Sequence, residues 1–217
     1  RFATGNPVDL LSGPGGSLYV LDGAAGTLSR YDRDGNRLDF FGASGSGSGQ
    51  LSNPQAFAIA QDGRFYVADT GNDRIQVFGA SGAFERTIGS PGSGLGQLRR
   101  PLGIAISEDR IIVSDQGNQR IATFSLDGAA LGSFPGVDPR GLSDVSGHGV
   151  LLALPQAGVA SLVERSLTSI STLDDRFAAG ELGSPVDVAP GEDGIWLADG
   201  SAPRIWALTE TLGFRRV

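Results

Sequence analysis

The sequence contains no cysteine, no lysine, one histidine and no apolar run long enough to span a bilayer. The absence of cysteine excludes disulfides, thiolate metal sites and a cysteine nucleophile. All 17 basic residues are arginines, scattered along the chain, and the net charge is -7. Because binding to nucleic acid needs a basic footprint, this charge argues against a DNA or RNA partner. We therefore expect a protein with no membrane span and no nucleic acid partner.

Glycine is abundant, with 34 residues in 217, and a unit of similar sequence recurs around a proline. Aligned on that residue, the five copies are marked by Pro7, Pro54, Pro101, Pro139 and Pro185. Their spacings are 47, 47, 38 and 46 residues, and the path from the last proline through both termini to the first is 39 residues. Periods of this size are typical of radial β-architectures in which each unit is one small sheet. A ring of five units would close with the termini adjacent.

The content of each unit predicts four short antiparallel strands. In the second unit, apolar segments at 57–60, 65–68, 75–78 and 84–88 are separated by turn residues such as Asp62-Gly63. No apolar stripe has helical spacing, so we expect almost no helix. The predicted fold is an all-β propeller of five four-stranded antiparallel blades. It forms a single domain over 1–217, with repeats at approximately 6–52, 53–99, 100–137, 138–183 and 184–217.

A polar signature follows the second strand of several units. Its members are Asp69, Asn72 and Arg74 in the second unit, Asp115, Asn118 and Arg120 in the third, and Asp199 and Arg204 in the fifth. The first unit keeps Asp22 but has Thr27 where arginine is expected, and the fourth has Leu154 in place of aspartate. Together with Gly-x-Gly-Gln-Leu-x-x-Pro ahead of each complete copy, this pattern resembles the NHL repeat. NHL propellers more commonly have six blades, so a six-bladed ring is the alternative.

The repetition of the signature favours a structural role. The carboxylate can accept hydrogen bonds from turn N–H groups, asparagine can close the loop, and arginine can reach an acceptor on the neighbouring blade. A catalytic site is normally built once, whereas repeat scaffolds reuse internal bonds in every unit. We interpret these residues as contacts that hold the blades together.

Three other motifs favour structural interpretations. Asp32–Asn36 begins like a calcium loop, but Arg37 and Ala43 occupy the positions that need glycine and glutamate, so it is read as a hairpin turn. The glycine-rich runs at 42–49 and 89–96 lie between strands and are read as connections between blades, because a nucleotide loop leads into a helix. His148 falls in a predicted hairpin turn, a poor place for a catalytic histidine.

The mouth of the central channel is the remaining candidate site. The residues just after each proline should surround it and form a mixed polar ring of Asp9, Gln55, Arg140 and Asp187. Such a ring could bind a small ligand. By resemblance to lactonase-like propellers it could also bind calcium, although only two of its members are carboxylates. A single histidine argues against the zinc and lyase chemistry of related propellers.

The resemblance to NHL proteins implies interaction rather than catalysis, so the leading hypothesis is a non-catalytic, monomeric scaffold that binds a protein or peptide. No metal or cofactor is expected. The alternative is a propeller with a small ligand or calcium in the axial mouth and lactonase-like or lyase-like activity. The fourth unit departs most from the repeat, with apolar segments at 151–155 and 159–163. Its two interpretations are sequence drift in a blade that tolerates it and a partner-facing surface. The all-arginine composition suggests a bacterium, and we expect a periplasmic or extracellular location, with a lipid anchor upstream as one option.

Overall fold

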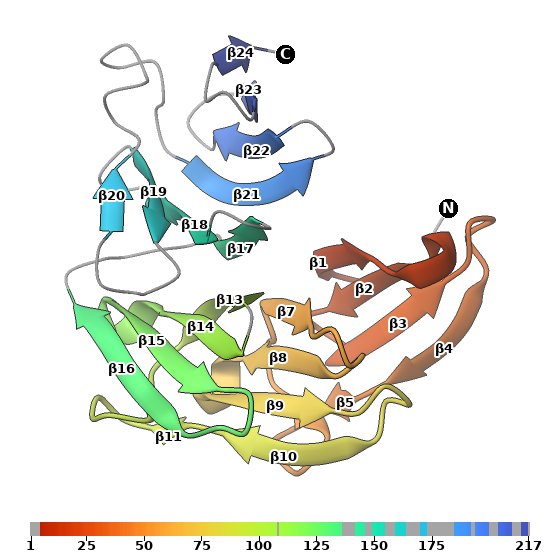
Figure 1. Cartoon of the computed structure of the whole chain (residues 1–217). Helices are drawn as coiled ribbons and strands as arrows, with labels where there is room; N and C mark the ends of the chain where they lie inside the picture. Colours follow the sequence, from red (N-terminus) through yellow and green to blue (C-terminus); the bar gives the residue numbers. More distant parts are fainter. Residues whose placement is uncertain are drawn as a thin grey trace.

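The computed structural model describes residues 5–107 and 109–135, and beyond them the backbone of strands between 142 and 216. The described chain consists of five four-stranded antiparallel sheets, each built from four consecutive strands (Figure 1). The first contains β1 (Pro7–Ser12), β2 (Leu18–Asp22), β3 (Thr27–Tyr31) and β4 (Arg37–Phe41). The second contains β7 (Ala56–Ile59), β8 (Phe65–Asp69), β9 (Arg74–Phe78) and β10 (Phe84–Ile88). The third contains β13 (Pro101–Ser107), β14 (Arg110–Asp115), β15 (Arg120–Ser125) and β16 (Ala130–Pro135).

The last two sheets follow the same order. The fourth contains β17 (Leu142–Val145), β18 (Gly149–Leu154), β19 (Val159–Val163) and β20 (Ile170–Thr172). The fifth contains β21 (Pro185–Gly191), β22 (Gly194–Asp199), β23 (Arg204–Thr209) and β24 (Phe214–Arg216). The predicted all-β fold with four-stranded antiparallel sheets is therefore confirmed.

Short elements connect the sheets and close their turns. Two parallel bridges lie in the glycine-rich connections: β5 (Ala43–Ser44) with β6 (Gln50–Leu51), and β11 (Ser90–Pro91) with β12 (Gln97–Leu98). The helical elements of the described residues are three single 3-10 turns, η1 (Pro14–Gly16), η2 (Thr70–Asn72) and η3 (Gln116–Asn118). Within this part of the chain, no helix is long and apolar enough to cross a membrane.

The hairpin turns follow from local chemistry. Gly63, Gly82 and Gly128 have φ values of 83°, 81° and 97°, a left-handed conformation that glycine adopts at little cost. In the first sheet, one carboxylate oxygen of Asp32 accepts the backbone N–H groups of Asp34 at 2.9 Å and Asn36 at 2.8 Å. This carboxylate closes the turn between β3 and β4, as expected for a hairpin rather than a calcium loop.

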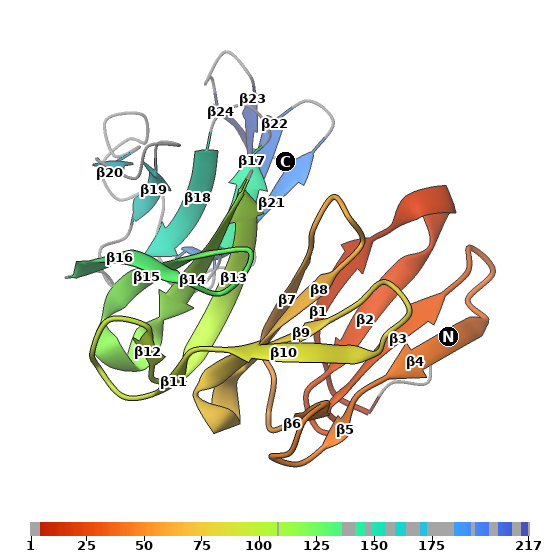
Figure 2. The same cartoon turned by 60° about the horizontal axis from the view of Figure 1, so that its bottom comes forward.

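The sheets are arranged along an arc, and their first strands line its inner side (Figures 1 and 2). Contacts join β1 to β7, β7 to β13, β13 to β17 and β17 to β21. Among the described strands, no comparable contact joins β21 to β1, and both views draw the first and fifth sheets apart. The expected adjacency of the two ends is not seen in this part of the chain. The spacing of prolines counts the units, but side-chain packing sets the angle between neighbouring sheets. Pairing of Arg1–Thr4 with the last strand of the fifth sheet, which would close a ring of five sheets, would involve residues outside the described part of the chain.

The core lies between the sheets, because alternate residues of a strand point to opposite faces. Between the first and second sheets, Phe41 lies 5.0 Å from both Phe65 and Phe78 by ring centroids, and Leu21 and Leu28 are fully buried. A second cluster fills the space between the second and third sheets. It contains Tyr66, Ile75, Val77, Ile104, Ile111, Val113 and Phe124. Burying each such side chain contributes about 1.5–3 kcal/mol, so stability comes from contacts between sheets rather than within one.

Candidate functional site

The signature aspartate of the second sheet is a fully buried acceptor at the end of β8. The carboxylate of Asp69 accepts the backbone N–H of Ser52 at 2.7 Å and the side-chain amide of Asn72 at 2.9 Å. It also accepts Nε of Arg74 at 2.8 Å and the side-chain amide of Gln76 at 3.0 Å. Four donors from the same protein therefore surround this carboxylate.

The two signature side chains that bind Asp69 also hold the glycine-rich connection that leads into the sheet. Arg74 donates to the carbonyl of Gly47 at 2.8 Å and to that of Gln50 at 3.1 Å, and Asn72 donates to the carbonyl of Gly45 at 3.0 Å. We expected the arginine to reach the neighbouring blade. Its acceptors belong instead to the connection, which passes over the end of the sheet where backbone carbonyls are available.

The third sheet repeats this geometry. Asp115 accepts the backbone N–H of Arg99 at 2.7 Å, Nδ2 of Asn118 at 2.8 Å and Nε of Arg120 at 2.7 Å. Arg120 in turn donates to three carbonyls of the second connection, those of Ser93, Gly94 and Gln97. The same bonds formed twice, on two successive connections, are a means of attaching each connection to the sheet that follows it.

The signature loop of the second sheet also bonds to the third. The hydroxyl of Thr70 donates to the carbonyl of Pro101 at 2.6 Å, and the carboxylate of Asp73 accepts the backbone N–H of Arg100 at 2.7 Å. These contacts could not be predicted from the residue pattern, because the partners of Thr70 and Asp73 are backbone groups. Asp73 adopts a left-handed φ of 55°.

In the first sheet, the carboxylate of Asp22 accepts four backbone N–H groups, those of Gly5 at 2.8 Å, Asn6 at 3.2 Å, Ala24 at 3.0 Å and Ala25 at 2.9 Å. Burial by itself would raise the pKa of Asp22, but these four N–H groups outweigh it and lower the pKa. Asp22 is therefore a stable anion rather than a proton donor.

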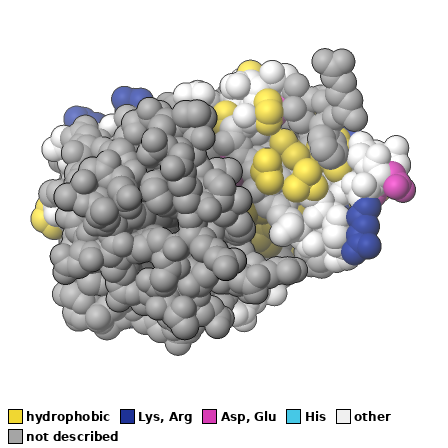
Figure 3. All heavy atoms as spheres, turned by 90° about the horizontal axis from the view of Figure 1, so that it is seen from above, with side chains coloured by type: hydrophobic (Ala, Val, Ile, Leu, Met, Phe, Trp, Pro, Cys, Tyr) yellow, Lys and Arg dark blue, Asp and Glu magenta, His cyan; other side chains and the backbone are white. Residues whose placement is uncertain are grey.

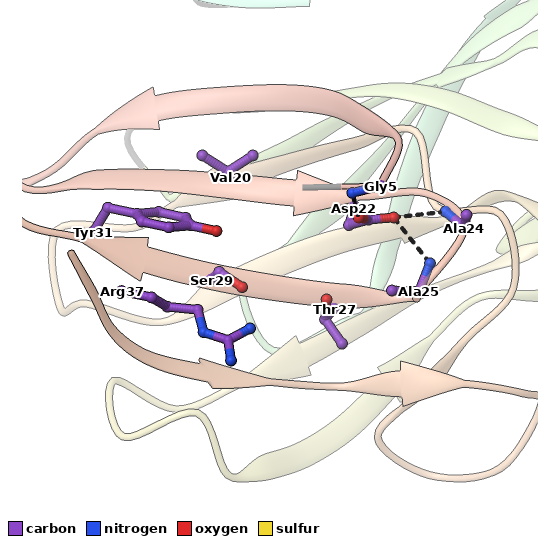
Figure 4. Close-up of a pocket in the computed structure, with 9 residues that line it drawn as sticks. All are labelled: Gly5, Val20, Asp22, Ala24, Ala25, Thr27, Ser29, Tyr31 and Arg37. Atoms are coloured by element: carbon purple, nitrogen blue, oxygen red, sulfur yellow. Dashed lines mark hydrogen bonds between the residues drawn. The ribbon is translucent and has the colours of Figure 1, made fainter. Parts of the chain in front are cut away.

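A cavity of about 320 Å³ lies beside Asp22 (Figure 4). Its lining comprises Gly5, Val20, Asp22, Ala24, Ala25, Thr27, Ser29, Tyr31 and Arg37. Thr27 stands where the second and third sheets have arginine, and Ala25 where they have asparagine, so the larger side chains that fill this place elsewhere are missing. Figure 4 shows the hydroxyls of Thr27, Ser29 and Tyr31 and the guanidinium of Arg37 around a common space. Within the described residues, no group of three His, Asp or Glu side chains could hold a metal ion.

Two of the four predicted mouth residues lie in the fully described part of the chain, and both bind their own protein. The carboxylate of Asp9 accepts the backbone N–H of Phe57 at 2.9 Å, which joins β1 to β7, and that of Leu10 at 2.8 Å. Gln55 donates to the side-chain oxygen of Asn53 at 3.1 Å and to the carbonyl of Pro54 at 3.2 Å. Neither residue lines the cavity beside Asp22.

The other residues singled out by the sequence lie in the last two units, where the structure describes the backbone of strands or leaves the residue undescribed. Arg140 and His148 lie outside the described residues, and Asp187 is placed by its backbone in β21, opposite Ala198. Asp199 lies opposite Pro185 and Arg204 in the backbone ladder. This matches the register of Asp115, which lies opposite Pro101 and Arg120. Leu154 ends β18, and the apolar segments of the fourth unit form β18 and β19.

Comparison with known proteins supports the fold. The model of the family DUF5128, described as a 6-bladed beta-propeller, matches residues 51–134, which contain the second and third sheets. No curated protein sequence matches the chain. Among solved structures, virginiamycin B lyase from Staphylococcus aureus with quinupristin is similar, with a TM-score of 0.72 and 16% identity over 95% of this chain and 68% of that one.

Two further structures resemble the chain and differ in biology. A chain of a nidogen/laminin complex has a TM-score of 0.70 and 17% identity over 93% of this chain and 74% of that one. The WD40 repeats of RRP9 have a TM-score of 0.73 and 13% identity over 100% of this chain and 81% of that one. Because identities this low show only the fold, the comparisons identify the chain as a β-propeller whose neighbours include both an enzyme and proteins without a named enzymatic activity.

Proposed function

We propose that this protein is a non-catalytic scaffold that binds a protein or peptide through the face bearing the signature loops. The observation that carries the proposal is how the polar side chains are used. Asp69 and Asp115 each accept hydrogen bonds from an asparagine, an arginine and a backbone N–H of their own protein. Asp9 and Gln55 bond to the protein at the mouth. Side chains that are hydrogen-bonded within the protein hold the scaffold rigid, and they are not available as general acids, general bases or metal ligands.

The signature loops and the starts of the inner strands lie at the same ends of the sheets, because Pro7 pairs with Asp22 and Pro101 with Asp115. Loops on a rigid scaffold are the usual carriers of recognition. Arg99 and Arg100 are exposed on this face, beside the loop of the second sheet. The nidogen/laminin complex supports the proposal by analogy, since it contains a propeller-like chain within a protein complex.

A peptide-display selection on the immobilised chain, with and without EDTA, tests the proposal. We expect enrichment of a peptide whose affinity is unchanged by EDTA and is reduced at least about tenfold by Arg100→Glu, a charge reversal at an exposed residue of this face. Asp127→Arg is the matched control, because Asp127 lies in the turn between β15 and β16, at the opposite ends of the strands. Equal weakening by both variants would contradict the assignment of the face.

The alternative is a small-ligand or calcium-binding propeller with lyase-like or lactonase-like activity at the axial mouth, and the virginiamycin B lyase structure is what favours it. A thermal-shift screen with calcium, EDTA and a panel of sugars and lactones distinguishes the two. If the protein is a scaffold, none of these additions should change its Tm. A calcium stabilisation reversed by EDTA, or a lactone shift abolished by Asp9→Asn, would support the alternative instead.

A further inference from the structure

Two adjacent arginines stand ahead of the innermost strand of the third sheet, where the second sheet has neutral residues. Arg99-Arg100 and Ser52-Asn53 occupy aligned positions in their repeats, and a proline follows each pair. The two backbones match, with a φ of 48° at Arg100 and 46° at Asn53. Arg99 and Ser52 each donate a backbone N–H to the signature aspartate at 2.7 Å. The two loops therefore share a backbone geometry and differ in charge.

Arginine is an unfavourable residue at the second of these positions. A φ near 48° is left-handed, a conformation that asparagine adopts more readily than a long side chain does. The surroundings hold the strained backbone in place, because the carboxylate of Asp73 accepts the N–H of Arg100 at 2.7 Å. The stem of Arg99 lies over Gly117, where an added Cβ would be 2.5 Å from the Arg99 Cγ. Residues kept in such conformations cluster at functional sites, so arginine here indicates a role in function.

The carboxylates on the face bearing the signature loops are bonded within the protein, whereas these two guanidinium groups are not. Five described aspartates lie at these ends of the strands, and each accepts at least one backbone N–H: Asp9, Asp22, Asp69, Asp73 and Asp115. Asp69 and Asp115 are also paired with the signature arginines. Arg99 and Arg100 are exposed, and neither forms an ion pair with a described carboxylate. Their charges are therefore available to a partner.

Two neighbouring guanidinium groups are suited to binding carboxylates. A guanidinium is planar and can form two parallel N–H···O bonds with one carboxylate, and each such charged bond is about twice as strong as a neutral one. Nucleic acid would need a broader basic footprint, and the chain as a whole carries a charge of -7. On the side of the molecule drawn in Figure 3, the arginines of the described residues lie in separate groups rather than in one basic patch. The chemistry of this loop therefore favours a short acidic segment of protein over nucleic acid.

We propose that Arg99 and Arg100 select an acidic peptide, with at least two aspartate or glutamate side chains, as the partner of the face bearing the signature loops. The proposal rests on the scaffold function proposed above and adds the chemistry of the partner. The two arginines precede β13, which contacts both β7 and β17, so a peptide bound to them lies next to other innermost strands as well. An acidic partner also explains why arginine, rather than asparagine, occupies the left-handed position.

The second sheet supplies the variant that tests the proposal. Arg99→Ser with Arg100→Asn copies Ser52-Asn53 onto the third sheet, removes both charges and places asparagine at the left-handed position. We expect an unchanged or higher Tm, and an affinity at least about tenfold lower for the peptide selected on the wild-type chain, measured by fluorescence anisotropy. Arg33→Glu is the matched control, because Arg33 is exposed in the turn between β3 and β4, at the opposite ends of the strands. It should leave the affinity unchanged.

Changes in the selected peptide provide the complementary half of the test. Replacing its aspartates and glutamates with asparagine and glutamine should weaken binding to the wild type at least about tenfold. The same replacement should weaken binding to the double variant much less, since both changes remove the same contacts. A peptide with one carboxylate replaced by arginine should bind Arg100→Glu more tightly than it binds the wild type. Added salt should weaken the wild-type complex, because exposed ion pairs are screened.

The outcomes separate the acidic partner from the scaffold function on which it rests. If no peptide is enriched on the wild-type chain, the scaffold function fails and the acidic partner fails with it. If the enriched peptides lack aspartate and glutamate, or if the amide peptides bind as tightly as the acidic ones, the scaffold function stands and the acidic partner is wrong. A double variant with a lowered Tm and an unchanged affinity would make the two arginines structural and overturn the proposal. So would a single-stranded oligonucleotide that binds the wild type more tightly than the peptide does and fails to bind the double variant, since the partner would then be nucleic acid.

Discussion

Replacing Asp69 with asparagine tests whether the signature is structural. The carboxylate has four donors around it, and an amide can offer only one oxygen while turning its own NH₂ group toward a donor. The Arg74 guanidinium, whose side chain is 17% exposed, also loses its counter-charge. Breaking a buried ion pair by removing one partner costs about 3–5 kcal/mol. We therefore expect Asp69→Asn to lower the free energy of unfolding by that amount.

The matched control is an ion pair of similar length at the surface. Arg30 and Asp39 are 2.7 Å apart, with side chains 39% and 55% exposed, whereas Asp69 is fully buried. Exposed pairs contribute about 0–1 kcal/mol, so Asp39→Asn should have little effect. Both variants remove an Asp–Arg ion pair, so the difference between Asp69→Asn and Asp39→Asn isolates the effect of burial.

Urea unfolding followed by circular dichroism measures both variants. At roughly 2–4 °C per kcal/mol for a domain of this size, Asp69→Asn should also lower the Tm by about 10 °C. The urea m-value should stay constant if only stability has changed. A loss from Asp69→Asn no larger than that from Asp39→Asn would refute the reasoning, because it would mean that the connection is held without this carboxylate.

Three further changes have defined outcomes. Leu51→Ala should lower the free energy of unfolding by about 2–5 kcal/mol, because Leu51 is fully buried at the end of its connection. Its control, Leu95→Ala, replaces a leucine that is 69% exposed and should change the free energy of unfolding by less than about 0.5 kcal/mol. Gln119→Gly should raise stability by up to about 1 kcal/mol, because Gln119 has a left-handed φ of 51°. Because the pKa of Asp22 is lowered on folding, its charge stabilises the protein above about pH 4 and that contribution is lost as the pH falls through the lowered pKa. Asp22→Asn should therefore destabilise the protein at pH 7 and much less at pH 3, as measured by urea unfolding at both pH values.

Each of these results has a clear opposite. Equal losses from the two leucine variants would mean that the connections do not anchor the sheets. A destabilised Gln119→Gly would show that the glutamine side chain contributes more than the left-handed backbone costs. If the free energies of unfolding of the wild type and Asp22→Asn differ by the same amount at pH 7 and at pH 3, the charge of Asp22 does not stabilise the fold.

Strands, turns and the number of sheets could be predicted from the sequence because they depend on local chemistry. Asp62-Gly63 forms a turn wherever two apolar strands flank it, and the proline spacing counts the units. The closure of the arc could not be predicted in the same way. It depends on the angle at which side chains such as Phe41 and Phe65 pack between sheets, and no residue count specifies that angle.

The candidate sites were predictable only in part. The signature residues could be found from their spacing, but the acceptors of Arg74 are carbonyls of Gly47 and Gln50, which no side chain identifies in advance. Thr27 was visible as a departure from the repeat. That the departure leaves a cavity follows only when three strands are brought together. The sequence predicts Asp9 at the mouth of the channel. It does not predict that the Asp9 carboxylate accepts the backbone N–H of Phe57, a partner 48 residues away in the sequence.

Hydrogen exchange at two backbone amides tests most directly whether the signature holds the connections. Ser52 and Arg99 lie in glycine-rich connections, and their N–H groups donate to Asp69 and Asp115 at 2.7 Å. We predict that both exchange as slowly as the buried strand amide of Val67, and that Asp69→Asn accelerates exchange at Ser52 while leaving Arg99 protected. Exchange at Ser52 and Arg99 as fast as at the exposed Leu95 would contradict the account.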